Sequence, residues 1–297
     1  MSVFTHTYVY IKEKKLCSLR SCCNTEVPER HTNVSFSAEP RYAIQMGLKT
    51  KLLARIPRVL KNTLKDSKLN YIRLCLNELI MKFFAPRYFG QTAEDAILKI
   101  YLPEKKGFYL DIGAGRPIKG SNTYALYLRG WTGVCIEPIT VNSKLLKLFR
   151  RRDKVLNILV GPKESIIDFW EFEPYEYSTA DEVVAEKVKK YNGVRLLNYS
   201  KKTVQPLSDL APSSSPLEAS LLSVDVEGFD LEVLKSNNWE SFRPRVICVE
   251  EWESTMDEHL KSEVENFLTS LDYKRKAWTG LSSIFVANSY LDSMPRL

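Results

Sequence analysis

Apolar and polar positions follow two alternating patterns from residue 88 onward. Short apolar runs that end in glycine, proline or an acid predict buried strands at 108–112, 133–136, 155–160, 221–224 and 246–249. The stretches between them carry apolar residues three and four positions apart, as amphipathic helices do. Two further runs, 273–278 and 281–286, predict a closing hairpin. The pattern predicts an α/β fold whose mostly parallel, seven-stranded sheet ends in an antiparallel hairpin.

The N-terminal part has a different pattern. Residues 1–45 show little periodicity, and we expect them to be flexible. Residues 46–87 place apolar side chains three and four positions apart with Lys and Arg between them, which predicts a basic helical arm. Its second helix should cover about 69–84. Two interpretations stay open: the arm packs on the domain of 88–297, or residues 46–85 contact a membrane surface or a protein partner.

The middle of the domain carries an insertion. Residues 166–172 alternate around acids and aromatics and predict an extra strand or hairpin. Residues 173–201 are polar and rich in tyrosine, with no strong strand signal. Such an insertion forms a lid on the substrate side or a plain excursion of the surface.

One segment, residues 108–138, combines a glycine turn with a helix and two strands. The first strand runs into Gly113-Ala114-Gly115, where glycine permits positive φ and close approach of a ligand. Ser121-Asn122-Thr123 offers N-cap residues for the helix, and the second strand ends at Glu137. This order of elements is half of a nucleotide-binding α/β sheet.

The acids of this segment favour S-adenosylmethionine (SAM) over a dinucleotide. A dinucleotide fingerprint needs a third glycine where this chain has Ile118, so the NAD pattern fails. Asp111, before the first glycine, would suit the ammonium or sulfonium of SAM, and Glu137 can accept both ribose hydroxyls. Alternatively, Asp111 only caps the turn that the glycines make.

A second group of acids follows later strands. The strand at 221–224 runs into Asp225-Val226-Glu227-Gly228, and the strand at 246–249 ends on Glu250. Ligands of open α/β sheets bind at the carboxyl ends of strands, so Asp225 and Glu227 should lie near the turn of Gly113 and Gly115. Asp225 and Glu227 could take a proton from an attacking hydroxyl or face a sulfonium. Alternatively, they cap the helix that follows.

Composition and charge narrow the class of protein. The chain has 297 residues, of which 44% are hydrophobic and 27% charged, as in an ordinary globular protein. The net charge of +7 comes from residues 1–90, with 16 Lys and Arg against 6 Asp and Glu, whereas the rest has 27 against 30. A slightly acidic domain argues against nucleic acid as its partner.

The cysteines and the N-terminal residues predict the cellular compartment of the protein. The six cysteines show neither a disulfide framework nor the spacing of a zinc site, which favours a reducing compartment. Residues 1–45 contain no apolar stretch long enough for a signal peptide or a membrane span. We expect a cytoplasmic protein.

Several ordered segments together resemble the FkbM family of SAM-dependent methyltransferases. They are GQTAEDAIL, the whole of 108–138, LLSVDVEGFDLEVLKSNNW and RPRVICVE, and the resemblance spans roughly 88–290. It implies a Rossmann-like class I methyltransferase fold that binds SAM and methylates hydroxyls, often those of saccharides. It implies that Asp111, Gly113, Gly115, Asn122 and Glu137 bind the cofactor and that Asp225 and Glu227 form the DxEG motif.

The implied reaction is in-line transfer of the SAM methyl group to a hydroxyl, and it needs no metal. Of the three histidines, only His259 lies within the predicted domain, in a helix where a surface position is the usual one. We therefore prefer a carboxylate base, with Asp225 ahead of Glu227 and Glu250. The alternative from another class is a catalytically silent methyltransferase fold that docks through its basic arm. Retention of the whole acid and glycine set favours the enzyme.

Overall fold

The computed structural model describes residues 67–84, 88–212, 220–251 and 255–294. The predictions for residues 1–45 and for the first helix of the arm lie outside these residues. The helix predicted at about 69–84 is present as α4 (Ser67–Phe84), and its assignment to a basic arm stays a prediction. Its apolar side chains Ile72, Leu76 and Leu79, spaced by three and four positions, are exposed. None of the helices in the described ranges combines the length and the apolar character that crossing a membrane requires.

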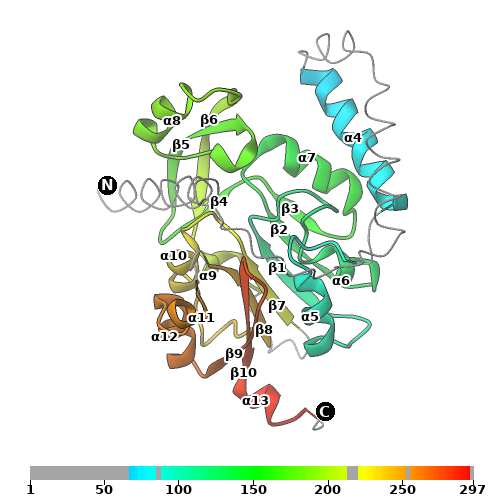
Figure 1. Ribbon diagram of the computed structural model, residues 1–297, viewed down its shortest axis with the longest axis vertical. Coiled ribbons are helices and arrows are strands. Elements are labelled where there is room, and N and C mark those ends of the chain that lie inside the picture. Colours follow the sequence, from blue (N-terminus) through cyan, green and yellow to red (C-terminus); the bar gives the residue numbers. More distant parts are fainter. Residues whose placement is uncertain (1–66, 85–87, 213–219, 252–254, 295–297) are drawn as a thin grey trace, which may run out of the picture. The chain divides into compact units, whose positions relative to one another are not determined.

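The predicted seven-stranded sheet is confirmed (Figure 1). Its strands are β1 (Phe108–Ile112), β2 (Thr132–Ile136), β3 (Lys154–Leu156), β7 (Ser220–Val224), β8 (Val246–Glu250), β9 (Tyr273–Trp278) and β10 (Ser282–Ala287). Their order is β3-β2-β1-β7-β8-β10-β9. The first five are parallel, and β10 runs antiparallel to both of its neighbours, as the predicted hairpin requires.

The strand order reverses direction between β1 and β7. From β1 the chain builds outward through β2 and β3, and it then returns to pair β7 with the opposite edge of β1. The helices that follow two neighbouring strands then cover opposite faces of the sheet, which opens a crevice at the carboxyl ends of these strands. The glycine turn after β1 and the acids after β7 therefore lie at the same place.

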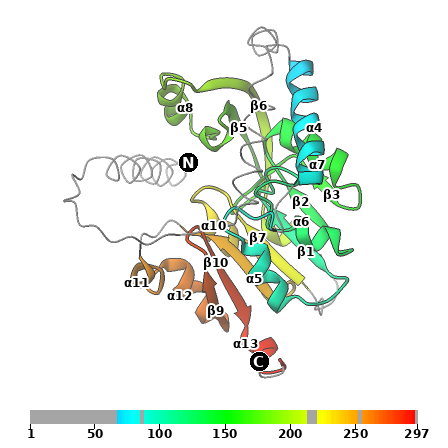
Figure 2. The same ribbon diagram turned by 45° about the vertical axis from the view of Figure 1, so that its right-hand side comes forward.

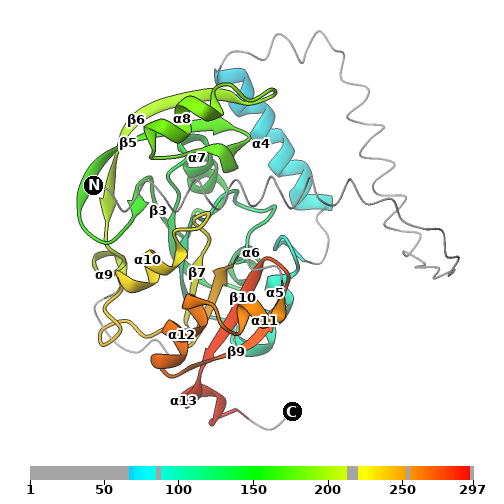
Figure 3. The ribbon, with the colours of Figure 1, turned by 60° about the vertical axis from the view of Figure 1, so that its left-hand side comes forward.

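Helices cover both faces of the sheet. The helices on one face are α5 (Glu94–Tyr101), α6 (Tyr124–Leu128) and α7 (Thr140–Phe149), and those on the other are α9 (Leu207–Leu210), α10 (Asp230–Lys235) and α12 (Glu263–Ser270) (Figure 2 and Figure 3). On the first face Leu98, Leu126 and Leu146 pack in one buried cluster, and on the second Leu234 and Leu268 pack in another. Two short helices, α11 (Met256–His259) and α13 (Asn288–Leu291), complete this part.

A second, three-stranded sheet corrects two predictions. The run at 155–160 is not one strand: β3 ends at Leu156, and β4 (Leu159–Val160) belongs to the small sheet. Residues 173–201 do contain a strand, because β6 (Arg195–Gln205) pairs antiparallel with β5 (Ser165–Glu173) and parallel with β4. The pairing was invisible in the local pattern because most side chains of β6 alternate irregularly between exposed and half-buried.

The small sheet has an apolar core of its own. Between β5 and β6 the chain forms a 3-10 turn, η1 (Tyr175–Tyr177), and then α8 (Glu182–Val188), which begins where Asp181 accepts the backbone N–H groups of Val183 and Val184. Trp170 and Phe172 of β5 pack against buried apolar side chains of α8. The insertion is therefore a folded element and not a loop.

Candidate functional site

The turn after β1 lies directly against the turn after β7. Gly113 has φ of +73°, and a Cβ built on it would stand 1.9 Å from the carbonyl oxygen of Asp225. No side chain fits there, so glycine is required by both backbone conformation and contact. Gly115 also has positive φ, +57°, but its neighbouring space is open, with the nearest heavy atom 3.8 Å from a Cβ. The open side of the turn is where a ligand can approach the backbone.

Glu137 is held at the mouth of this turn. Its carboxylate accepts the backbone N–H of Gly115 at 2.7 Å and that of Ile139 at 2.7 Å. The side chain is buried, and desolvation raises its pKa to about 8, with the charges of Glu171 and Asp225 adding to the effect. Glu137, which directly follows β2, is thus fixed against the glycine turn, and the ribose role assigned to it stays a prediction.

Asp111 lies beneath the turn. It is 4% exposed and accepts a hydrogen bond of 2.5 Å from the hydroxyl of Thr123. Burial raises its pKa, while Thr123 and the nearby Arg150 oppose the rise. This arrangement fits the alternative interpretation, in which Asp111 anchors the turn; direct contact with a cofactor stays a prediction.

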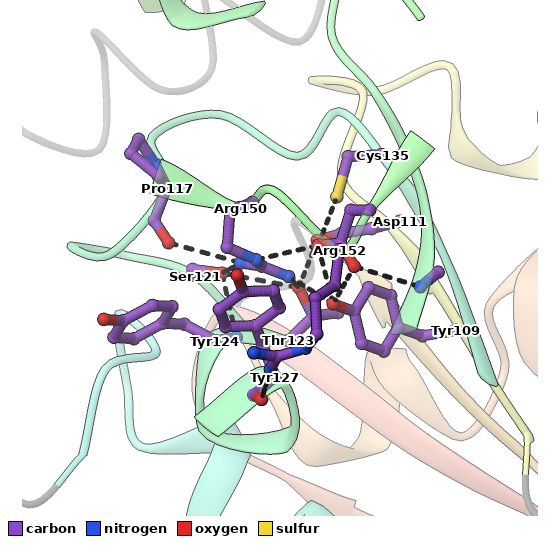
Figure 4. Close-up of polar contacts among 12 residues, drawn as sticks. Tyr109, Asp111, Pro117, Ser121, Thr123, Tyr124, Tyr127, Cys135, Arg150 and Arg152 are labelled. Atoms are coloured by element: carbon purple, nitrogen blue, oxygen red, sulfur yellow. Dashed lines mark hydrogen bonds and ion pairs between the residues drawn. The ribbon is translucent and has the colours of Figure 1, made fainter. Parts of the chain in front are cut away.

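Arg150 joins Asp111 to the rest of the site, and the sequence analysis missed it (Figure 4). Its guanidinium is fully buried and uses all five N–H donors. The acceptors are Asp153 at 2.9 Å, the carbonyl of Pro117 at 3.2 Å, Ser121 at 3.3 Å, Tyr109 at 2.8 Å and Thr123 at 2.9 Å. One side chain after α7 thus holds β1, the glycine turn and the start of α6. The sequence analysis missed Arg150 because it belongs to the run Arg150-Arg151-Arg152, and a run of arginines predicts an exposed basic surface.

Asn122 lies over the floor of the site. Its amide donates to the hydroxyl of Ser223 at 3.4 Å and to the sulfur of Cys248 at 3.7 Å. Both acceptors face the same side of the sheet as Asp111, because Asp111, Ser223 and Cys248 are aligned across β1, β7 and β8. Asn122 therefore bridges β7 and β8 on the face of the sheet that carries Asp111.

Asp225, the residue after β7, lies beside Glu250, the last residue of β8. Asp225 and Glu250 each follow an aligned pair, Ser223 and Cys248, by two residues, so their side chains share a face. A hydrogen bond joins the two carboxyl groups, which requires one shared proton. Burial raises the pKa of Asp225 to about 8, with Glu227 and Asp230 contributing, and burial holds the pKa of Glu250 well above its ordinary value.

Asp230 holds the loop that carries these acids. It is buried and accepts the backbone N–H groups of Val226 at 3.1 Å and Gly228 at 3.0 Å. Burial raises its pKa to about 7, against the pull of those hydrogen bonds. The third predicted acid, Glu227, is half-buried and has a left-handed backbone, φ +56°. The sequence does carry a signal for Asp230. It is the first residue of α10, and an acid in the first turn of a helix commonly accepts backbone N–H groups.

His259 occupies a different place from the one expected. It is fully buried and not on the surface, and its ring packs on Trp278 at 4.4 Å between centroids. Its Nδ1 lies 3.6 Å from Glu251, which follows Glu250 and so points toward the other face of the sheet. His259 is therefore not grouped with Asp225. Among the residues that the structure describes, no group of three or more His, Cys, Asp or Glu side chains is placed to hold a metal ion.

The lead-in helix also reaches the site. Glu94 is buried and accepts hydrogen bonds from the backbone N–H of Thr92 at 3.0 Å and the hydroxyl of Thr279 at 3.2 Å. A Cβ on Gly90 would come within 3.3 Å of the amide oxygen of Asn122. The start of α5 and the residues before it thus lie against Asn122 and against the turn between β9 and β10.

These observations place a glycine turn and a group of acids together at the carboxyl edge of a mostly parallel sheet, where open α/β sheets bind their ligands. A family model, the methyltransferase FkbM domain, matches residues 111–275, more than half of the chain. The protein belongs to the FkbM methyltransferase family.

Comparison with solved structures gives distant likenesses. Methyltransferase FkbM from Methylobacillus flagellatus aligns with a TM-score of 0.40 and 15% identity over 61% of this chain and 44% of that one. A hypothetical protein from Thermus thermophilus aligns with a TM-score of 0.32 and 14% identity over 68% of this chain and 89% of that one. The chain thus covers less than half of the FkbM structure. No curated protein matches it.

Replacement of Arg150 should unfold the site. Arg150→Met leaves the buried Asp153 without its ion-pair partner, and we expect a loss of about 3–5 kcal/mol in the free energy of unfolding. Urea unfolding measures it. Arg151→Met, at the next and exposed position, is the matched control and should leave stability unchanged. Equal stability of the two variants would contradict the assigned role of the Arg150 network.

Alanine at the two turn glycines should have unequal effects. Gly113→Ala meets the Asp225 carbonyl as well as unfavourable φ, whereas Gly115→Ala meets only the φ penalty, roughly 1 kcal/mol. We expect the first to be less stable than the second by at least about 1 kcal/mol in thermal or urea unfolding. Equal losses would show that the two turns do not touch as described.

The stability of the ligand-free protein should fall as pH rises. The folded-state pKa values of Asp225 and Glu137, about 8, lie above their ordinary values of 3.8 and 4.5, so the folded state binds protons more tightly. This stabilisation is complete below about pH 4 and is lost as pH rises through about 8. Urea unfolding at about pH 5.5 and about pH 8.5 should show a fall that Asp225→Asn reduces by about 1 kcal/mol or more. A flat profile, or an unchanged slope in the variant, would refute the raised pKa of Asp225.

Proposed function

We propose that this protein is a SAM-dependent O-methyltransferase that acts on a hydroxyl of a saccharide or a similar acceptor. The observation that carries the proposal is the fixed position of Glu137 against the N–H of Gly115 at 2.7 Å. It joins the acid after β2 to the glycine turn after β1, beside the acids after β7. The strand order, with its antiparallel β10, supports a class I methyltransferase sheet.

The residues present fit SAM. Gly115 leaves open backbone beside the turn, and each Glu137 oxygen that accepts one N–H keeps a free lone pair for a ribose hydroxyl. The paired acids after β7 and β8 suit a nearby cationic ligand, because a positive charge favours their ionised forms. When bound, SAM supplies the electrophilic methyl group.

The acceptor side is assigned to Asp225 and Glu250. Oε2 of Glu250 is buried and has no hydrogen-bond partner in the described part of the chain, so it can accept one from an acceptor hydroxyl. A bound sulfonium would favour loss of a proton from this pair, and the resulting carboxylate can orient the hydroxyl and take up its proton. Asp230 keeps the Asp225 loop in place through its two backbone hydrogen bonds.

Proton release should report the cofactor site. Binding of a sulfonium lowers the pKa of Asp225 and its partners, so SAM binding near pH 7.5 should release part of a proton. S-adenosylhomocysteine lacks the sulfonium charge and is the matched control, with less release expected. Isothermal titration calorimetry in buffers of different ionisation enthalpy measures both, and NAD serves as the competing cofactor.

Each result has a clear meaning. SAM binding with greater proton release than S-adenosylhomocysteine, reduced in Asp225→Asn, supports the proposal. Failure of the folded protein to bind SAM would reject it and favour a silent fold that binds through its arm. Binding of NAD in place of SAM would reject it in favour of a dinucleotide enzyme.

A further inference from the structure

A buried ion pair fastens the small sheet to the loop that carries Glu137. Lys202 of β6 and Glu171 of β5 are 6% and 2% exposed, and Nζ of Lys202 lies 3.3 Å from Oε1 of Glu171. Burying two charges costs desolvation energy that the pair rarely regains as stability. A role in fixing geometry explains such a pair better than a role in stability.

The pair reaches the Glu137 loop by two routes. In the first, Lys202 donates to the Asn157 side-chain oxygen at 2.8 Å, and the Asn157 amide donates to the backbone carbonyls of Glu137 at 2.8 Å and Pro138 at 2.9 Å. In the second, Glu171 accepts the backbone N–H of Thr140 at 2.8 Å and its hydroxyl at 2.6 Å, and Lys202 also donates to that hydroxyl at 3.0 Å.

The loop is thereby held at four consecutive residues. Asn157 holds the carbonyls of Glu137 and Pro138, the Glu137 carboxylate holds the N–H of Ile139, and Glu171 holds the N–H of Thr140. Three of the four anchors depend on side chains that Lys202 contacts directly. The direction in which Glu137 presents its carboxylate therefore depends on Lys202.

Charge supports the same conclusion. Glu171 is among the groups that raise the pKa of Glu137, after burial itself. The ammonium of Lys202 offsets the charge of Glu171. Without the Lys202 ammonium, Glu137 would hold its proton more tightly and would accept hydrogen bonds from a diol less well.

We propose that Lys202 is a positioning residue that presets Glu137 for a ribose diol, and that the small sheet thereby serves cofactor selection. This inference rests on the proposed function, because it takes Glu137 as the ribose ligand. It assigns the insertion to the cofactor side of the site and not to a lid over the acceptor.

The test compares two probes, S-adenosylhomocysteine and its 2′,3′-dideoxyribose counterpart, by calorimetry on the full chain. The wild type should prefer the ribose compound by about 10-fold or more, as expected for a hydrogen bond to a carboxylate. Lys202→Met should reduce the preference to about 2-fold or less and leave the affinity for the dideoxy compound unchanged. Lys201→Met is the matched control, because Lys201 is exposed and pairs with Asp168 at the surface.

A second variant keeps the test informative if Lys202→Met alone fails to fold. Lys202→Met combined with Glu171→Gln removes both buried charges together, which a protein tolerates better than loss of one. It should fold and still show a reduced ribose preference, since Asn157 has lost its donor. Restoration of the full preference would mean that charge alone matters and would overturn the geometric role.

The remaining outcomes separate the two proposals. An unchanged preference in folded Lys202→Met, or equal weakening of both probes, would overturn the positioning role and leave the methyltransferase proposal intact. A wild type that binds both probes equally would overturn it too, because Glu137 would not be the ribose ligand. A wild type that binds neither probe would overturn both proposals.

Discussion

The full satisfaction of one buried guanidinium is the constraint on which the site depends. Arg150 has no access to water, so each of its five N–H donors needs an acceptor in the protein. Those acceptors come from β1, the loop after the glycine turn, the start of α6 and the turn between α7 and β3. Any movement of one of these elements leaves a donor or a charge unpaired. The network therefore fixes the positions of these elements relative to one another.

The other half of the site, around the ends of β7 and β8, holds acids whose negative charges repel one another. Asp230 and Glu250 are buried and Asp225 is half-buried, and the pKa of each is raised by desolvation and by the charges of its neighbours. Backbone hydrogen bonds to Asp230 and the shared proton between Asp225 and Glu250 reduce the repulsion. The contact of Gly113 with the Asp225 carbonyl then couples the two halves. A cationic ligand at this point would relieve the repulsion that the ligand-free fold must tolerate.

The small sheet links the peripheral insertion to the centre. Its own core, around Phe172 and α8, lets it hold a defined shape, and its polar face carries the Lys202–Glu171 pair. Through Asn157 and Thr140 that pair reaches the loop after β2. The insertion is therefore connected to the Glu137 side of the crevice by buried hydrogen bonds, which fix direction more sharply than apolar packing does.

The sequence alone determined the features that depend on local pattern. Apolar runs that end in glycine or acid located the strands of the main sheet, its closing hairpin and the turn at Gly113, because burial and positive φ restrict residue type locally. The same patterns placed Glu137, Asp225 and Glu250 at strand ends. Only the tertiary structure decided which of these residues meet and which partners hold them.

The failures have a common physical cause. The run at 155–160 was split between two sheets, and β6 was missed, because strand pairing is a long-range choice that alternation in one strand does not reveal. His259 was expected on the surface and is buried, and Arg150 lay hidden in a basic run. Partners distant in the sequence decide where charged and polar side chains lie, so the roles of these residues follow from the fold. Glycine turns and apolar strands, in contrast, are determined by the local sequence.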